Sequence, residues 1–255
     1  MVAQHVFDQL RVRVHESTPA MARDAAALAS AAIRSAIDTR GHANVMFASG
    51  ASQLEFLKLL VADAAIDWRA VTGFHMDEYV GLGPTHPASF QRYMRDHLTA
   101  LVPLAALHCL QGDAADPTAE VARYSALLET HPLDLCCLGV GENGHLAFND
   151  PPAADFEDPL TVKLVRLDEA CKAQQVGGGH FASLAEVPPV AMTVTIPALV
   201  RARSVLAIAS GARKARPVRD ALLGPIAPAC PASALRRCPQ AVLLLDRDSA
   251  ALLGR

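Results

Sequence analysis

The stretch "LDLCCLGVGENGHLAFND" (Leu133–Asp150) joins an apolar run to a dense group of polar side chains. The apolar part, 133–140, is typical of a strand that is buried on both faces. The part that follows, 141–150, contains a glutamate, a histidine, two asparagines and an aspartate. So much polar chemistry directly after a buried strand indicates a functional site at the end of that strand.

Other apolar runs repeat this pattern along the chain. Residues 10–15 alternate in polarity, as in a strand with one wet face, and a helix is expected from Ser17-Thr18-Pro19 to Gly41 and another from Ser52. Alternation of buried strands with helices predicts a parallel sheet covered on both faces. No linker or repeat divides the chain, so we expect a single domain over 1–255. The further strands are expected at 43–49, 69–76, 190–196, 203–209 and 241–245, and the further helices near 88–101, 117–130, 212–223 and 248–253.

The composition excludes several classes of function. The 255 residues are 51% hydrophobic and carry a formal charge of −3, without the basic stripe that nucleic-acid binding requires. The first residues, "MVAQHVFDQL", lack the basic start and apolar stretch expected of a signal peptide, and no apolar segment is long enough to cross a membrane. Its six cysteines lack CxxC or zinc-site spacing, which indicates reduced thiols. We therefore expect a cytoplasmic protein that binds neither nucleic acid nor membrane.

In a parallel sheet, ligands bind outside the carboxyl ends of the strands. The loop after Ser49 has a glycine for a tight turn, Gly50, and Ser52 with Glu55 forms an S-x-x-E capping box. Such a helix start is either an anion site or an ordinary capped helix. After Ser210, Lys214 is placed either to neutralise a phosphate or simply to be solvated.

Two acidic residues, Asp77 and Glu78, follow the strand expected at 69–76. Adjacent side chains on an extended chain point to opposite sides, so only one of them can readily face the crevice. That carboxylate could act as a general base, or it could cap the next turn. The sequence leaves both interpretations open.

The loop after Val140 matches GxGxxG, but Pro151-Pro152 leave no room for the long helix of a dinucleotide-binding fold. The glycines instead favour close approach of the backbone to a smaller ligand. His145 and Asp150 are spaced as a pair in which the carboxylate orients the ring and supports its charged form, or as parts of a structural turn. No histidine spacing indicates a metal site.

Together, "MDEYVGL", "HPASFQRYM", "GVGENGHLAFNDP", "AMTVTIPALV" and "SGARKA" occur in an order that resembles the glucosamine-6-phosphate deaminase (isomerase) family. The likeness runs from about residue 40 to the C-terminus. Ala147-Phe148-Asn149 separates the third motif from the related 6-phosphogluconolactonases, whose segment reads more like GHTASLF. The resemblance implies an α/β fold, a three-layer sandwich with a mainly parallel, Rossmann-like central sheet.

The resemblance also implies an activity and roles for residues. An amino-sugar 6-phosphate and water would become fructose 6-phosphate and ammonium, without metal or organic cofactor. Asp77 would move a proton between C2 and C1 through an enediol-type intermediate, and His145 would open the pyranose ring with help from Asn143 and Asp150. The phosphate would be held by the loop formed by Ser49, Gly50, Ala51 and Ser52, together with Lys214.

Three positions depart from the family pattern. Asn143 stands where the best-known members have Asp, Asp150 stands where Glu is usual, and a gapped match places His180 where members use a phosphate-binding Arg. Two other functions are compatible with the pattern, a sugar-phosphate lactonase and a non-catalytic sugar-phosphate sensor. The partner in each case is a small sugar phosphate; its epimer is left open, and a homo-oligomer is one possible assembly.

Overall fold

The computed structural model describes residues 2–151, 153–167, 169–177, 179 and 181–254. The larger of its two sheets has eight strands in the order β1-β2-β11-β10-β7-β3-β4-β6, and every neighbouring pair except β1–β2 is parallel. The strands are β1 (Ala3–Phe7), β2 (Leu10–His15), β3 (Ala43–Phe47), β4 (Val71–His75), β6 (Ala106–His108), β7 (Leu135–Gly139), β10 (Ser204–Ala209) and β11 (Ala241–Asp246).

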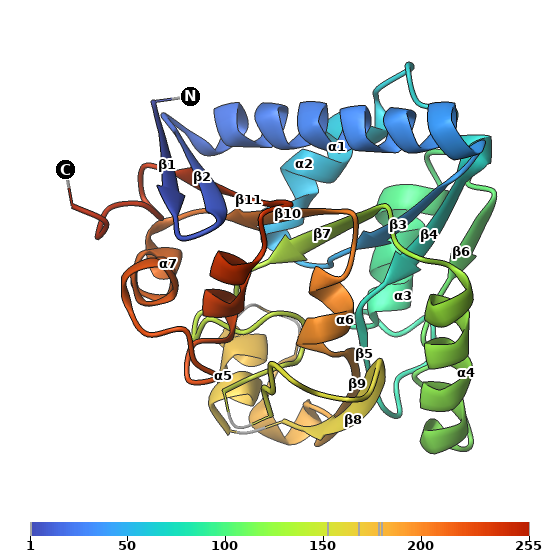
Figure 1. The fold of residues 1–255 in the computed structure, drawn as a ribbon. Helices are drawn as coiled ribbons and strands as arrows, with labels where there is room; N and C mark the ends of the chain where they lie inside the picture. Colours follow the sequence, from blue (N-terminus) through green and yellow to red (C-terminus); the bar gives the residue numbers. More distant parts are fainter. Residues whose placement is uncertain (1, 152, 168, 178, 180, 255) are drawn as a thin grey trace.

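Helices cover both faces of this sheet (Figure 1). One layer contains α1 (Thr18–Arg40), α2 (Ala51–Val61), α3 (Phe90–Met94) and the π-helical turn η2 (Arg95–Thr99). The other contains α4 (Pro117–Thr130), α6 (Ile196–Val200), α7 (Ala215–Leu223) and the 3-10 helix η5 (Pro231–Arg237). Successive β7 side chains alternate between the two cores, with Leu135 and Cys137 in one and Cys136 and Leu138 in the other. The expected three-layer α/β sandwich is confirmed.

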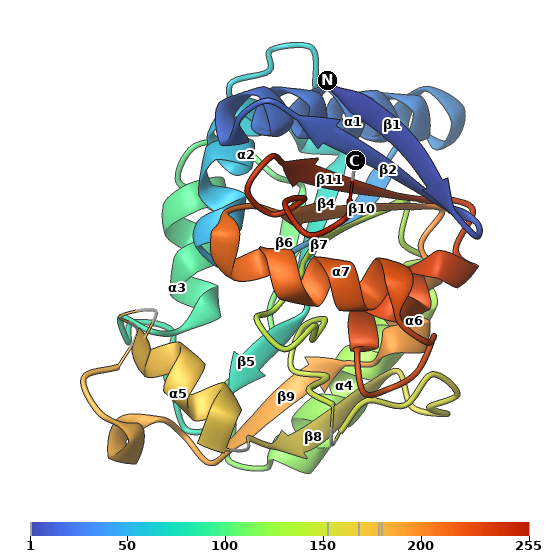
Figure 2. The same cartoon turned by 90° about the vertical axis from the view of Figure 1, so that its left-hand side faces the viewer.

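A second, smaller sheet lies below the carboxyl edge of the first in the view of Figure 1. It has three antiparallel strands, with β9 (Val190–Val194) between β5 (Asp77–Tyr79) and β8 (Val162–Arg166). The short helices α5 (Glu169–Gly177) and η3 (Leu184–Glu186) accompany it (Figure 2). The strand expected at 190–196 therefore exists, but its assignment to the parallel sheet is wrong. An apolar run buried by a second sheet has the same composition as one buried inside the first.

The predicted caps are confirmed for α1 but not for α2. Ser17 caps α1, accepting a hydrogen bond from the Ala20 N–H, and Gly41 ends that helix in the left-handed region at φ 78°. The capping box at Ser52 and Glu55 is wrong, because α2 begins at Ala51 with Gly50 as a cap that offers no side chain.

Near the C-terminus, the helix expected at 248–253 is a series of turns. The Ser249 N–H donates to the Asp246 side chain at 2.8 Å, and the Asp246 N–H donates to the Ser249 hydroxyl at 3.1 Å. These local bonds compete with helix formation. The two remaining 3-10 turns are η1 (Trp68–Ala70) and η4 (Ala212–Lys214), and η4 precedes α7, so that Pro217 falls in the first turn of that helix.

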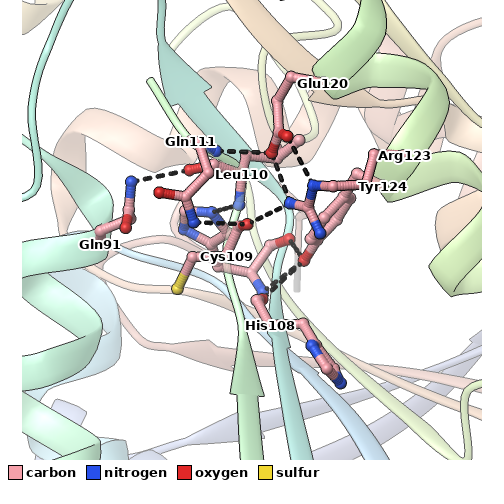
Figure 3. Close-up of polar contacts among 9 residues, drawn as sticks. Gln91, His108, Cys109, Leu110, Gln111, Glu120, Arg123 and Tyr124 are labelled. Atoms are coloured by element: carbon pink, nitrogen blue, oxygen red, sulfur yellow. Dashed lines mark hydrogen bonds and ion pairs between the residues drawn. The ribbon is translucent and has the colours of Figure 1, made fainter. Parts of the chain in front are cut away.

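Polar contacts fix the chain at the carboxyl end of β4. The buried ring of His75 accepts the Leu110 N–H at 2.8 Å, and burial lowers the pKa of His75 to about 3, so the ring is neutral. The Tyr124 hydroxyl lies 2.7 Å from the His75 carbonyl and 3.0 Å from that of His108 (Figure 3). These contacts fix the position of the backbone at His75, two residues before Asp77. No helix among the described residues is long and apolar enough to cross a bilayer.

Candidate active site

A cavity of about 440 Å³ opens at the carboxyl ends of β3, β4, β7 and β10. All four loops singled out in the sequence contribute to its wall, through residues 48–52, 76–77, 139–142 and 210–214. Asp77, His145 and Lys214 line this one cavity, although they are far apart in sequence. Asn143 and Asp150 stand behind His145 and do not form part of the wall.

The two adjacent acidic residues have separate tasks. Asp77 faces the cavity, whereas Glu78 is fully buried and points the other way. The Glu78 carboxylate accepts hydrogen bonds from the Ser89 hydroxyl at 2.8 Å and from the N–H groups of Phe90 and Gln91 at 3.2 and 2.9 Å. It therefore satisfies the start of α3. Of the two interpretations, the cap applies to Glu78 and leaves Asp77 available for chemistry.

Asp77 has an unusual electrostatic setting. Its side chain is only 7% exposed and accepts no hydrogen bond from the described residues. Burial raises the pKa of Asp77 well above its usual value, and the charges of Glu78 and Asp150 raise it further. A carboxyl group with a raised pKa is a stronger base once it is deprotonated, as proton abstraction requires.

His145 is held in place by a carboxylate and an amide. Its Nδ1 lies 3.0 Å from Asp150 Oδ1, and Asn143 Nδ2 donates to the same oxygen at 2.7 Å. The Asn143 Oδ1 in turn accepts the His145 backbone N–H at 3.0 Å. Burial pushes the pKa of Asp150 upward, but the hydrogen bonds and charge of His145, with the bonds from Asn143 and Cys171, outweigh it and lower the pKa overall. Asp150 is therefore an anion that orients the imidazole and leaves its Nε2 unoccupied by this pair.

Gly141 supplies the space for the His145 ring. A Cβ atom built on Gly141 would overlap three atoms of the imidazole. The Gly141 N–H also donates to the His145 carbonyl at 2.9 Å, closing the loop on itself. The glycine in this motif is thus required by the histidine of the same loop and not by a dinucleotide.

The loop also rests on β9. The Phe148 N–H donates to the Thr193 hydroxyl at 3.1 Å, and the Asn149 side chain donates to the Val194 carbonyl at 2.8 Å. Ala147, between these contacts and His145, has a φ of 52° and lines the cavity. Asn149 is completely buried, so its role in the motif is to hold the loop.

The other end of the cavity offers an environment for an anion. Gly50, at φ 119°, turns the chain so that α2 begins at Ala51, and the first N–H groups of a helix have no partners within it. Lys214 lines the same cavity and forms no ion pair with the described residues. Burial and the nearby Arg213 lower the pKa of Lys214, while Glu142 opposes the shift.

The cavity contains side chains that the sequence motifs did not single out. Gln174 and Gln175 reach it from α5, and Arg213 precedes Lys214 on η4. The Tyr79 hydroxyl donates to Gln175 at 2.7 Å, which ties α5 to the strand that carries Asp77. The expected contact of His180 lies outside the described residues.

Comparison with known proteins agrees with this geometry. A sequence model of the family described as glucosamine-6-phosphate isomerases/6-phosphogluconolactonase matches residues 16–244. The chain belongs to this family. Members of the family that it resembles include a glucosamine-6-phosphate deaminase of Exiguobacterium sibiricum, 38% identical over 189 residues, which cover 74% of this chain and 73% of that protein. The corresponding protein of Listeria innocua is 34% identical over 215 residues, covering 84% of this chain and 90% of that protein.

Solved structures from the same family show the fold. A monomeric glucosamine-6-phosphate deaminase superimposes with a TM-score of 0.86 at 27% identity, over 94% of this chain and 99% of that chain. A 6-phosphogluconolactonase of Shewanella baltica gives a TM-score of 0.75 at 20% identity, over 92% and 97%. At that identity the second likeness concerns the fold alone.

Replacing Gly141 with alanine tests how His145 is positioned. We expect Gly141→Ala to displace the imidazole, because the new Cβ would occupy its place. The imidazole signals of His145 in NMR spectra should shift, without loss of the folded state in thermal unfolding. Gly139→Ala is a matched control, since its Cβ would lie 3.6 Å from Gln53 and Ser52, at ordinary contact distance. Unchanged His145 signals in Gly141→Ala would contradict the packing described here.

The raised pKa of Asp77 has a consequence for stability. A carboxyl group whose folded-state pKa is raised binds its proton more tightly when folded, so stability falls as pH rises from the unfolded pKa, about 3.9, to the folded one. Asp77→Asn removes this cost. The variant should unfold at a higher temperature than the unaltered protein at pH 8, and the difference should shrink as the pH is lowered toward 4.

Asp134 provides the contrasting control for this measurement. It is equally buried, but it accepts the Arg40 guanidinium at 2.6 Å and the Asn44 N–H at 2.8 Å. Asp134→Asn should therefore lower the unfolding temperature at pH 8. If Asp77→Asn were destabilising to the same degree, Asp77 would be a structural carboxylate.

Proposed function

We propose that the protein converts glucosamine 6-phosphate, or a close amino-sugar phosphate, and water into fructose 6-phosphate and ammonium. The observation that carries this proposal is the position of Asp77 and His145 in the wall of one cavity, with His145 held from behind by Asp150 and with an environment for an anion at the other end. The cavity volume of about 440 Å³ falls in the range of roughly 300–1,000 Å³ usual for small-molecule sites. The identity of 34–38% with glucosamine-6-phosphate deaminases supports the same reaction.

The first step of this reaction opens the pyranose ring. A proton must leave the C1 hydroxyl and another must reach the ring oxygen. His145 is suited to this transfer, because Asp150 holds its Nδ1 and leaves the opposite nitrogen for the substrate. In the proposal Asn143 keeps Asp150 in position, through the hydrogen bond that the Asn143 side-chain amide donates to Asp150 Oδ1 at 2.7 Å. The product of the step is the open-chain aldehyde.

The second step moves hydrogen between two carbons. Asp77 removes the proton from C2, giving an enolamine, and returns a proton to C1, giving an imine at C2. Water then hydrolyses the imine to the ketone and releases ammonium. The same group must take up and give back a proton, and a carboxyl group whose pKa is raised, as that of Asp77 is, holds the transferred proton more readily than an ordinary aspartate.

The phosphate would occupy the opposite end of the cavity. There it would meet the loop Ser49–Gly50–Ala51–Ser52 and the ammonium of Lys214. Helix N–H groups and a lysine together suit a phosphate dianion. His180 would add to this end if it takes the place of the arginine used by other family members.

The proposal is tested by measuring ammonium and ketose phosphate with a panel of compounds. The panel contains glucosamine 6-phosphate, galactosamine 6-phosphate, unphosphorylated glucosamine, glucose 6-phosphate and 6-phosphogluconolactone. We expect ammonium from an amino-sugar phosphate and almost none from glucosamine. Hydrolysis of the lactone without ammonium release would establish a lactonase instead, and the absence of any turnover, with binding retained, would establish a sensor.

The role of Asp77 is tested by Asp77→Asn in the same assay. Loss of the base should reduce turnover by about 10²–10⁴-fold, because a general base typically contributes that factor. In the unaltered protein, kcat/KM should decline on acidification at a pH above the usual Asp pKa, since the base must be deprotonated. Fructose 6-phosphate should still bind to the variant. Turnover close to that of the unaltered protein would remove Asp77 from the mechanism.

A further inference from the structure

Arg213 and Glu142 face each other at the mouth of the cavity. Arg213 belongs to η4, after β10, and Glu142 belongs to the loop after β7. The Arg213 Nη1 lies 3.4 Å from Glu142 Oε1, and the two side chains are 75% and 38% exposed. Ion pairs with this exposure contribute little to stability. The guanidinium can therefore change partners at little cost.

The charges of Arg213 and Glu142 both act on Lys214. All three line the cavity, and the charges of Glu142 and Arg213 act on Lys214 in opposite directions. A phosphate that reaches Lys214 thus enters a field made by two cations and one carboxylate. A phosphate monoester carries a charge of about −1.5 to −2 at neutral pH, more than the single charge of Glu142.

We propose that Arg213 is a second phosphate-binding cation, and that Glu142 occupies its guanidinium until a phosphate dianion displaces the carboxylate. The fork of an arginine side chain matches phosphate oxygens in a bidentate manner, which Lys214 cannot do. The inference rests on the proposed function in one respect, namely that the ligand is a sugar phosphate. It assigns to Arg213 a part of the substrate affinity.

The exchange requires little movement of the backbone. The Glu142 N–H donates to the Gln174 side chain of α5 at 3.3 Å, so the main chain at this position has a separate partner. Only the Glu142 side chain must turn away from Arg213 toward solvent. The arrangement makes Glu142 a competitor of phosphate for one guanidinium and predicts opposite effects for the two residues.

The experiment measures binding of inorganic phosphate and of fructose 6-phosphate to the full chain by calorimetry. Arg213→Gln should weaken the binding of both ligands by roughly tenfold. This is the loss expected for one charge-assisted contact, reduced because the ligand no longer has to displace Glu142 from the guanidinium. Glu142→Gln should strengthen both. Arg216→Gln is the matched control: Arg216 is 82% exposed and does not line this cavity, so its loss changes the net charge equally and should leave both affinities almost unchanged.

The decisive comparison is Arg213→Gln in the Glu142→Gln background. If Arg213 contacts the phosphate, its removal should weaken binding there at least as much as in the unaltered protein. If Arg213 served only to neutralise Glu142, its removal would have no effect once Glu142 is gone. That result would overturn the inference. So would equal affinities for Arg213→Gln and Arg216→Gln, or no phosphate binding by the unaltered protein.

These measurements separate the inference from the proposed reaction. Phosphate binding that depends on Arg213, in a protein that releases no ammonium from any compound of the panel, would disprove only the reaction. Ammonium release with phosphate affinity independent of Arg213 would disprove only the inference. Thermal unfolding of each variant establishes that the binding changes occur in folded protein.

Discussion

The pairing of β5 with β9 holds both halves of the candidate site. Asp77 lies opposite Thr193 in this antiparallel pair, and the Thr193 hydroxyl accepts the Phe148 N–H of the His145 loop at 3.1 Å. One strand therefore fixes the carboxylate and the imidazole relative to each other. Sites built on strands hold reacting groups more accurately than sites built on loops alone. Here the loop that carries His145 is fixed by its hydrogen bond to β9.

Three carboxyl groups are buried in this small region, and they differ in their hydrogen-bond donors. Glu78 accepts hydrogen bonds from α3, Asp150 accepts bonds from His145 and Asn143, and Asp77 accepts none from the described residues. These donors favour the charged form of both groups: for Asp150 they lower the pKa overall, whereas for Glu78 burial outweighs them and the pKa stays raised. The absence of such donors around Asp77 leaves its charged form costly. Of the three, the carboxylate that faces the cavity is therefore the one whose charge no hydrogen bond from the described residues stabilises, and perturbed pKa values of this kind are common at functional sites.

Much of this arrangement could be predicted from the sequence, because the parallel strands are continuous apolar runs and their carboxyl ends must meet at one edge. The four loops were identifiable for that reason. The strand pattern by itself could not separate Asp77 from Glu78, since alternation assigns opposite sides without saying which side is the cavity; only the family resemblance pointed to Asp77. The sequence also could not place β9, whose apolar residues fit either sheet, or Arg213, whose long side chain reaches the cavity from an ordinary turn.

Asn143 and Asp150, the two residues of the His145 loop that depart from the family pattern, are matched to each other. Asn143 can donate its amide hydrogen to Asp150 and accept the His145 N–H at the same time. An ionised aspartate at 143, the residue common in the family, could accept but not donate, and it would stand 2.7 Å from the Asp150 oxygen as a like charge. It would also add to the charges of Glu78 and Asp150 that already raise the pKa of Asp77. Although Asp150 is one methylene shorter than the usual glutamate, its oxygen is within 3.0 Å of the imidazole. The amide therefore lets the shorter carboxylate remain ionised against His145 without further hindering the ionisation of Asp77.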